Sequence, residues 1–135
     1  MSLSPLSLID HIGLQVSDIA RAKAFYVLAL APLSIGVVME IPAALTGGGD
    51  VIGFGRNGKG ELWLEGGART VPHLHVAFRA ATRELVDAFY QAAISAGGRD
   101  NGKPGPRPIY HADYYGAFVL DPDGHNLEAV CHAPA

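Results

Sequence analysis

The sequence predicts an α+β protein made of two tandem βαβββ modules, and three observations support this fold class. First, chemically unusual residues recur at one constant offset of 64 positions: His11 and His75, Phe25 and Phe89, and Tyr26 and Tyr90. Second, each set starts in a β-like stretch and continues into a helix-like one. Third, each half closes with apolar β-like stretches separated by turn residues. We therefore infer an internal duplication within a single domain, residues 1–135, with modules at about 6–67 and 72–133.

The first module begins with a strand over residues 8–16, in which His11, Gly13 and Gln15 share one face. Ser17 or Asp18 offers an N-cap for a helix over residues 20–30, which is rich in good helix formers and is ended by Pro32. Three further strands are predicted in this module: residues 33–40, 51–55 and 61–65. A turn at Asn57-Gly58 separates the last two strands.

The second module repeats this order. Residues 74–78 predict a strand, and residues 82–96 predict a helix that Gly97-Gly98 ends. Thr82 lies 64 positions after Asp18 and repeats the N-cap. We expect residues 102–108, which are rich in proline and glycine, to form a loop.

A β-hairpin closes the second module. Residues 116–120 and 126–130 are β-like, and the turn Asp121-Pro122-Asp123-Gly124 joins them, because proline presets its backbone angle and Gly124 accepts a positive φ. We expect His125, at the end of this turn, to be solvated. Glu128 is a carboxylate within an apolar strand, so it either faces water or serves as a ligand.

Composition narrows the possible functions. The apolar content of 49% with only 17% charged residues provides a sizeable core, and a net charge of −3 without a basic cluster disfavours nucleic acid as a partner. No run approaches the ~20 apolar residues that cross a bilayer, and residues 1–8 do not resemble a secretory leader. The single Cys131 indicates a reducing compartment and a buried, unreactive thiol. We expect a cytoplasmic protein without membrane association.

The duplication makes His11 and His75 equivalent, so two modules packed about a pseudo-twofold axis would bring both imidazoles to one place. Glu128 would complete this set. Its counterpart in the first module should lie in residues 61–65, but the offset of 64 lands on Leu64, so the pairing must shift.

Either Glu61 or Glu65 could then serve as the fourth ligand, and we favour Glu61 because it opens its strand after a turn. Two neutral imidazoles with one or two carboxylates suit a divalent Fe, Ni, Mn, Co or Zn ion and leave coordination positions open. Either histidine alone would more simply be a hydrogen-bonded structural residue. The repeated position is what favours metal binding.

Three motifs resemble the vicinal oxygen chelate superfamily, which includes glyoxalase I, extradiol dioxygenases, and fosfomycin- and bleomycin-resistance proteins. They are Asp10-His11-Ile12-Gly13-Leu14 with Phe25-Tyr26, then His75-Val76-Ala77-Phe78, and above all the segment from Phe118 to Glu128. The resemblance spans nearly the whole chain. Within the superfamily, the sequence is similar to a bacterial glyoxalase-like subgroup. It implies modules that curve into a cup of mixed sheet around a divalent metal.

In that resemblance, His11, His75 and Glu128 match the family's ligand positions and Glu61 matches the fourth less closely. Substrates of the family typically present two adjacent oxygens to the metal. Short relatives commonly form homodimers, in some cases exchanging modules so that each cup draws on two chains. We therefore expect a small-molecule substrate and a homodimer.

The leading hypothesis is a metal-dependent lyase or isomerase of the glyoxalase type, in which the cation polarises adjacent oxygens and Glu61 or Glu128 moves a proton between carbons. An Fe(II) extradiol-type dioxygenase is the alternative if Glu61 does not reach the metal, because that chemistry needs three protein ligands. A non-catalytic binding protein of the antibiotic-resistance type is a third interpretation. It is disfavoured because this chain keeps the ligand residues. His111, Tyr110, Tyr114 and Tyr115 could form a wall beside the site.

Overall fold

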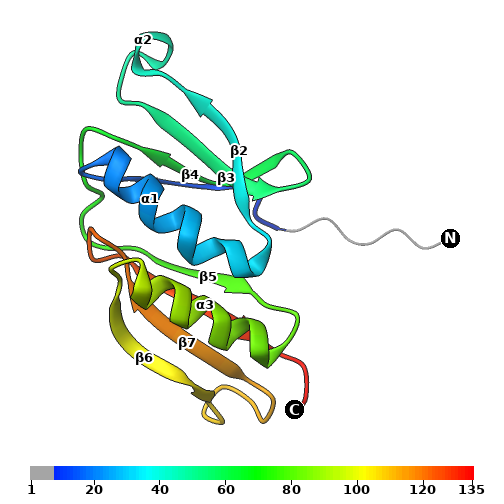
Figure 1. The fold of residues 1–135 in the computed structure, drawn as a ribbon. Coiled ribbons are helices and arrows are strands. Elements are labelled where there is room, and N and C mark those ends of the chain that lie inside the picture. The colour runs from blue at the N-terminus through cyan, green and yellow to red at the C-terminus, as the bar shows by residue number, and fades with distance from the viewer. Residues whose placement is uncertain (1–7) are drawn as a thin grey trace, which may run out of the picture.

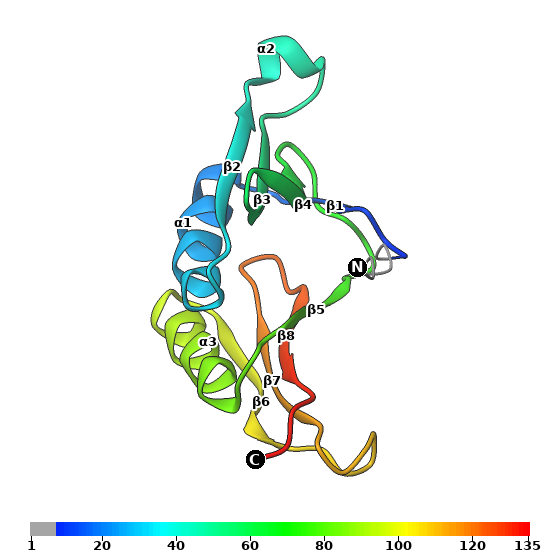
Figure 2. The same cartoon turned by 90° about the vertical axis from the view of Figure 1, so that its right-hand side faces the viewer.

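The computed structural model describes residues 8–135 and contains two four-stranded sheets with helices on one side (Figure 1; Figure 2). The first module contains β1 (Ile12–Gln15), α1 (Ile19–Leu30), β2 (Gly36–Ile41), β3 (Val51–Arg56) and β4 (Lys59–Glu65). Its strands lie in the order β1-β4-β3-β2, with β1 parallel to β4. A short 3-10 helix, Ala31–Leu33, and a short α2, Ala43–Thr46, were not predicted. The predicted start of this module, at about residue 6, lies outside the described residues.

The second module repeats the βαβββ order of the strands and the main helix, with the same sheet topology. It contains β5 (His75–Arg79), α3 (Arg83–Ser95), β6 (Arg99–Pro106), β7 (Tyr115–Leu120) and β8 (Asn126–Cys131). Its strands lie in the order β5-β8-β7-β6, with β5 parallel to β8. The predicted α+β class and the two repeated βαβββ modules are therefore confirmed.

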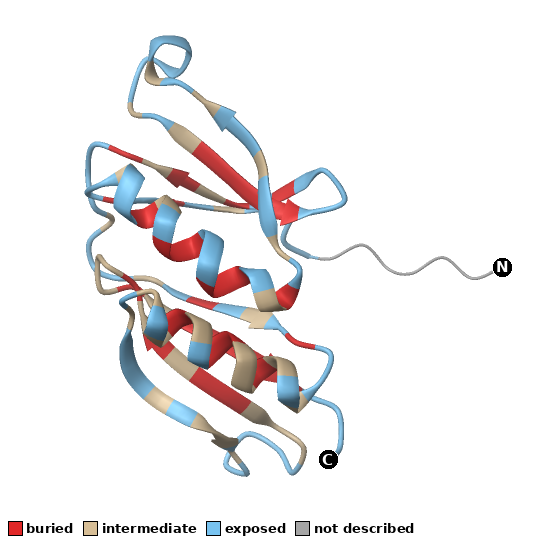
Figure 3. Ribbon diagram, in the orientation of Figure 1, coloured by how far each residue is buried: buried red, intermediate tan, exposed pale blue. Residues whose placement is uncertain are grey.

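Both main helices begin where the sequence predicts. The Asp18 carboxylate accepts a hydrogen bond from the Arg21 amide, and the Thr82 hydroxyl oxygen accepts one from the Leu85 amide. These caps satisfy amide groups that have no partner within a helix. The duplicated Phe25 of α1 and Phe89 of α3 are buried, as predicted. Buried residues gather where the helices and the sheets face one another (Figure 3).

Two predicted elements differ from the structure. The first strand is shorter than predicted, so His11 immediately precedes β1. The expected loop at residues 102–108 is instead largely strand β6, whose pairing with β7 is irregular around Gly102 and Gly105. This strand is at the edge of its sheet, where proline is tolerated because one side of the strand needs no ladder hydrogen bonds.

The predicted turn of the last hairpin also joins the two modules. The Tyr26 hydroxyl of α1 donates to the buried Asp121 carboxylate at 2.5 Å, and the Ser17 hydroxyl donates to Asp123 at 2.5 Å. His125 is fully buried rather than solvated, and its Nδ1 accepts a hydrogen bond from the Leu74 amide at 3.0 Å. The turn is thus a buried structural joint, which explains its polar composition.

β1 and β5 are edge strands of the two sheets and run in opposite directions (Figure 1). Within the described residues, no hydrogen-bonded pairing joins the two sheets, while α1 and α3 pack side by side. Opposed strands place the start of β1 near the end of β5. None of the helices in residues 8–135 has the length and apolar character needed to span a membrane.

Candidate metal-binding site

One of the predicted ligand pairs is assembled in the second module. His75 is the first residue of β5 and Glu128 lies on the parallel neighbour β8. The His75 Nε2 and Glu128 Oε1 atoms are 2.9 Å apart. Glu128 is only 2% exposed, so the expectation that it might simply face water is wrong. Backbone pairing of two adjacent strands therefore holds an imidazole against a buried carboxylate.

The second oxygen of Glu128 has its own partner. The Tyr114 hydroxyl donates a short hydrogen bond to Glu128 Oε2. Burial, followed by this hydrogen bond and the charge of Glu128, raises the pKa of the Tyr114 phenol well above its ordinary value. The phenol therefore stays protonated and remains a donor through the neutral range.

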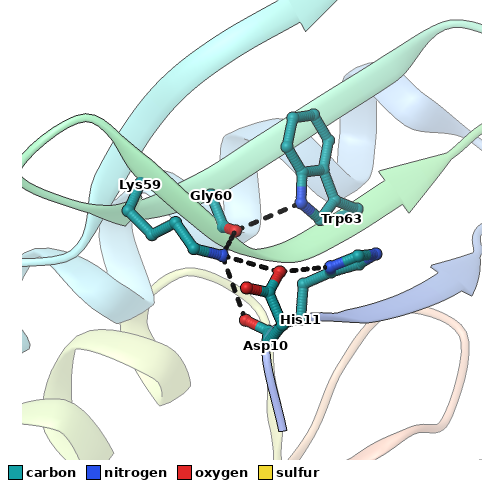
Figure 4. Close-up of polar contacts among 5 residues, drawn as sticks. All are labelled: Asp10, His11, Lys59, Gly60 and Trp63. Atoms are coloured by element: carbon teal, nitrogen blue, oxygen red, sulfur yellow. Dashed lines mark hydrogen bonds and ion pairs between the residues drawn. The ribbon is translucent and has the colours of Figure 1, made fainter. Parts of the chain in front are cut away.

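His11 has a different environment. Its Nδ1 is 2.7 Å from the Asp10 carboxylate, which also accepts from Lys59 Nζ at 2.9 Å (Figure 4). The hydrogen bond from Lys59, followed by that from His11, lowers the pKa of Asp10. An ionised Asp10 holds the proton of His11 on Nδ1, which leaves Nε2 as the nitrogen with a free lone pair. This arrangement is common for histidines that bind metals.

Glu61 lies near His11 but makes a weaker case as a ligand. Both residues line a cavity of about 500 Å³ between the two modules, together with Val76–Arg79 of β5. Glu61 is exposed and its side chain has no hydrogen bond within residues 8–135. Glu65, the other predicted choice, accepts a hydrogen bond from the side-chain Nε2 of Gln15 at 3.2 Å.

The two histidines are not side by side in one chain. His11 shares the cavity with Val76–Arg79, whereas His75 starts β5 and does not line that cavity. A strand rises about 3.3 Å per residue, so the two ends of β5 are roughly 13 Å apart. Within residues 8–135, no three His, Cys, Asp or Glu side chains approach closely enough to bind one ion. A single chain thus presents His75 with Glu128 in one place and His11 with Glu61 in another.

Strand pairing shows which residue replaces Glu128 in the first module. Ile12 pairs with Leu62, and its duplicate Val76 pairs with Leu127. Leu62 therefore corresponds to Leu127, and the counterpart of Glu128 is Trp63. Glu61 instead corresponds to Asn126, so our argument for Glu61 from the repeat is not supported by the pairing.

Trp63 is held in place by the strands around it. Its Nε1–H donates to the Gly60 carbonyl at 3.3 Å, and its ring covers Gly53 and Gly60 so closely that a Cβ at either position would clash with the indole. The half-buried indole thus occupies the face where a fourth carboxylate would lie.

Sequence reasoning missed three contributors to the site. Asp10 next to His11 was visible only as part of a motif, and Tyr114 was considered only as a wall. Gly116 gave no signal, yet a Cβ there would be 3.1 Å from Glu128 Oε2 and 3.3 Å from the Tyr114 ring. A glycine at this position therefore makes room for the contact between Tyr114 and Glu128.

The donor atoms of the His75–Glu128 pair fit a divalent cation. Ligands at about 2.0–2.2 Å from one ion and at right angles are roughly 3 Å apart, close to the 2.9 Å separation of these two atoms. A cation could replace the proton that the pair now shares. His11 offers a third nitrogen of suitable chemistry, but from a separate part of the chain.

Duplicated βαβββ modules with imidazole and carboxylate groups on paired strands define a glyoxalase-type fold. The chain belongs to the Glyoxalase/Bleomycin resistance protein/Dioxygenase superfamily, whose family model matches residues 8–129. The resemblance found in the sequence is therefore confirmed. A comparison with curated proteins gave no match.

Solved structures share this fold. A glyoxalase/bleomycin resistance protein from Albidiferax ferrireducens T118 is 25% identical, with a TM-score of 0.78 over 93% of this chain and 99% of that chain. A mutant of the fosfomycin resistance protein FosX from Listeria monocytogenes, in complex with Mn(II) and 1S,2S-dihydroxypropylphosphonic acid, is 21% identical. Its TM-score is 0.62, with coverage of 97% of this chain and 93% of that chain.

A mutant of glyoxalase I from Zea mays is 22% identical, with a TM-score of 0.67. The match covers 90% of this chain but 46% of the maize chain.

Proposed function

We propose that the protein is a divalent-metal-dependent enzyme that acts on a small substrate with adjacent oxygens, and that His75, Glu128 and His11 hold the cation. The observation that carries this proposal is the contact between His75 and the buried Glu128, on strands that repeat the position of His11. The FosX complex, similar in fold, contains Mn(II) together with a vicinal diol. A bound cation would act as a Lewis acid on the substrate oxygens.

We further propose that a homodimer completes the site, with His11 of one copy joining His75 and Glu128 of the other. This accounts for a chain that has both histidines although each lies at the start of its strand and β1 and β5 run in opposite directions. It also accounts for Asp10, which prepares the Nε2 lone pair of His11 although no set of three potential ligands forms around that nitrogen within the described chain.

For the reaction, a glyoxalase-type lyase or isomerase needs a carboxylate that can take up and return a proton. Glu61 suits that role because it lines the cavity beside His11 and its side chain is not engaged in a hydrogen bond within residues 8–135. Glu128 is buried between two hydrogen-bond donors and suits the role of ligand and positioning group. A fourth ligand from Glu61 stays a prediction.

One observation favours a second candidate function, an Fe(II) extradiol-type dioxygenase. Trp63, rather than a carboxylate, corresponds to Glu128 in the first module. Two histidines and one carboxylate form the ligand set of many non-haem Fe(II) oxygenases, which need open coordination positions. Ring cleavage of a catechol by the Fe(II)-loaded protein in air would support this function, whereas isomerisation of a 2-oxoaldehyde–thiol adduct would support the lyase.

Metal content tests the proposal before any substrate is known. The His75→Ala variant, purified without chelators, should lose bound metal when the wild-type protein retains it, as measured by elemental analysis per chain. His73→Ala is the matched control, because His73 is an exposed histidine two residues earlier and outside β5. Equal metal content in His75→Ala and wild type would contradict the ligand assignment.

A further inference from the structure

We propose that Tyr114 is a positioning residue for Glu128, and that it fixes which carboxylate oxygen faces the cation. This inference rests on the proposed function. The observation behind it is that each oxygen of the buried Glu128 carboxylate has a different partner. Oε1 faces His75 Nε2 at 2.9 Å, and Oε2 accepts from the Tyr114 hydroxyl.

The hydroxyl of Tyr114 therefore acts on the oxygen that does not face the candidate cation position. A hydrogen bond to the far oxygen of a ligating carboxylate prevents the group from rotating. Outer-shell partners of this kind typically change metal affinity by roughly 10–100-fold. Because Glu128 is 2% exposed, water cannot readily replace a lost phenol at Oε2.

Tyr114 is itself held by an aromatic cluster. Its ring centroid lies 4.7 Å from that of Tyr110, 5.5 Å from that of His111 and 5.4 Å from that of His132. The backbone closes the loop before it, because the Arg107 amide donates to the Tyr114 carbonyl at 2.8 Å. The phenol is thus placed on Glu128 by packing on several sides.

The two histidines of this cluster connect the loop to the chain end. The Asp113 amide donates to His111 Nδ1 at 3.1 Å, so the proton of a neutral His111 lies on Nε2 and is donated to His132 Nδ1 at 2.9 Å. A metal at this pair would need the opposite tautomer of His111 and would break the bond from Asp113. We therefore assign the pair as a clamp for Tyr114 rather than as ligands.

Gly116 provides the space for this arrangement. A Cβ at residue 116 would be 3.1 Å from Glu128 Oε2 and 3.3 Å from the Tyr114 ring, tighter than ordinary contact. Gly116→Ala should separate the phenol from the carboxylate without removing either group. It is an independent way to break the same contact.

Tyr115 supplies a matched control. Its hydroxyl donates to the Asp87 carboxylate at 2.7 Å, on α3 and away from Glu128. Tyr114→Phe and Tyr115→Phe are substitutions at neighbouring positions, and each removes one hydroxyl group that donates to one carboxylate. Only the first should affect the cation.

The experiment is calorimetric titration of the full-length apo-protein with Co²⁺, together with the visible absorption spectrum of the Co²⁺ complex. Tyr114→Phe should weaken binding about 10-fold or more and change the spectrum, because the orientation of Glu128 changes. Gly116→Ala should act in the same direction and serves as the test if Tyr114→Phe does not fold. Tyr115→Phe should keep wild-type affinity and spectrum.

The outcomes separate this inference from the proposed function. If the wild type binds Co²⁺, His75→Ala does not, and Tyr114→Phe retains wild-type affinity and spectrum, the positioning role is wrong while the metal site stands. If the wild type binds no Co²⁺, or His75→Ala binds it equally well, the proposed function fails and this inference fails with it.

Discussion

The two modules share one topology but differ at the strands that carry the candidate ligands. In the second module, β5 and β8 bring His75 against Glu128, and Tyr114 covers the remaining carboxylate oxygen. In the first module, His11 immediately precedes β1, and Trp63 of β4 stands in place of Glu128. The comparison teaches that the repeat kept the histidine in both copies but the buried carboxylate in only one.

A further difference lies in how each histidine is prepared. Asp10 holds Nδ1 of His11 and leaves its Nε2 free, whereas Nε2 of His75 already contacts Glu128. One module therefore offers a single nitrogen and the other offers a pair of ligands. Together they would supply three ligands, which is why we expect the two modules to contribute unequally to cation binding.

The largest expected effect contrasts the two glutamates. Glu128→Gln should lower affinity for a divalent cation by more than about 100-fold, because losing even an outer-shell partner costs roughly 10–100-fold. Glu61→Gln should lower it by less than about 10-fold, because Glu61 occupies the position of Asn126 and not that of Glu128. Calorimetric titration measures both affinities. An equal loss in the two variants would restore the symmetric four-ligand site.

The next contrast concerns the two hairpin turns. Asp121→Ala should lower the free energy of unfolding by about 3 kcal/mol, because it leaves the Tyr26 hydroxyl and the amides of Asp123 and His125 without their acceptor. Asn57→Ala should cost about 1 kcal/mol, from its left-handed backbone with φ of 52°.

Urea denaturation of both variants measures this difference. Asp123→Ala serves as a control within the same turn, because among residues 8–135 the Asp123 carboxylate accepts hydrogen bonds only from the exposed Ser17. A loss in Asp121→Ala no greater than in Asn57→Ala would show that the buried joint between modules is not important for stability.

The duplicated tyrosines predict a pH effect. Burial, followed by the charge and hydrogen bond of Asp121, raises the pKa of Tyr26 in the folded state. The unfolded chain therefore loses this proton at a lower pH than the folded protein. The contribution of Tyr26 to the free energy of unfolding is complete below about pH 10 and falls as the pH rises further, by up to about 1.4 kcal/mol per pH unit for one tyrosine. Tyr26→Phe should reduce this alkaline slope more than Tyr90→Phe. Urea titrations above and below pH 10 test it, and equal slopes would contradict the assignment.

The smallest effect is optical. Trp63 is the only tryptophan in the chain and lies on the strand next to His11. Paramagnetic Co²⁺ should therefore quench its fluorescence when the ion is bound near His11. His75→Ala should abolish this quenching, although it changes the other module. Quenching that survives in His75→Ala would place the cation elsewhere.

The fold could be predicted from the sequence where signals are local. The offset of 64 residues gave both modules, and the Asp121–Gly124 turn gave the last hairpin. Strand β6 was missed because Pro104, Gly102 and Gly105 disfavour regular strands, and only its edge position in the sheet makes them tolerable. His125 was placed in solvent because its partner, the Leu74 amide, is 51 residues away and gives no local signal.

The candidate site was also predicted only in part, because its remaining features depend on contacts between distant segments. The identities of His11, His75 and Glu128 follow from repeat and motif, and the structure brings two of them together. The counterpart of Glu128 could not be read, because it depends on how β4 pairs with β1, and the offset landed one residue away from Trp63. The separation of the two histidines depends on the direction of β1 relative to β5. The spacing of residues within each module does not determine that direction.

The most direct test of the claim that two chains build the cation site is complementation between two variants that each lack one ligand. His11→Ala and His75→Ala are each expected to bind no cation tightly, but a co-expressed mixed dimer carries one site with His11 from one chain and His75 from the other. We predict that mixed dimers, isolated with two different tags, recover one divalent cation per dimer by elemental analysis. Mixed dimers that bind no more cation than either variant alone would contradict a site built from two chains.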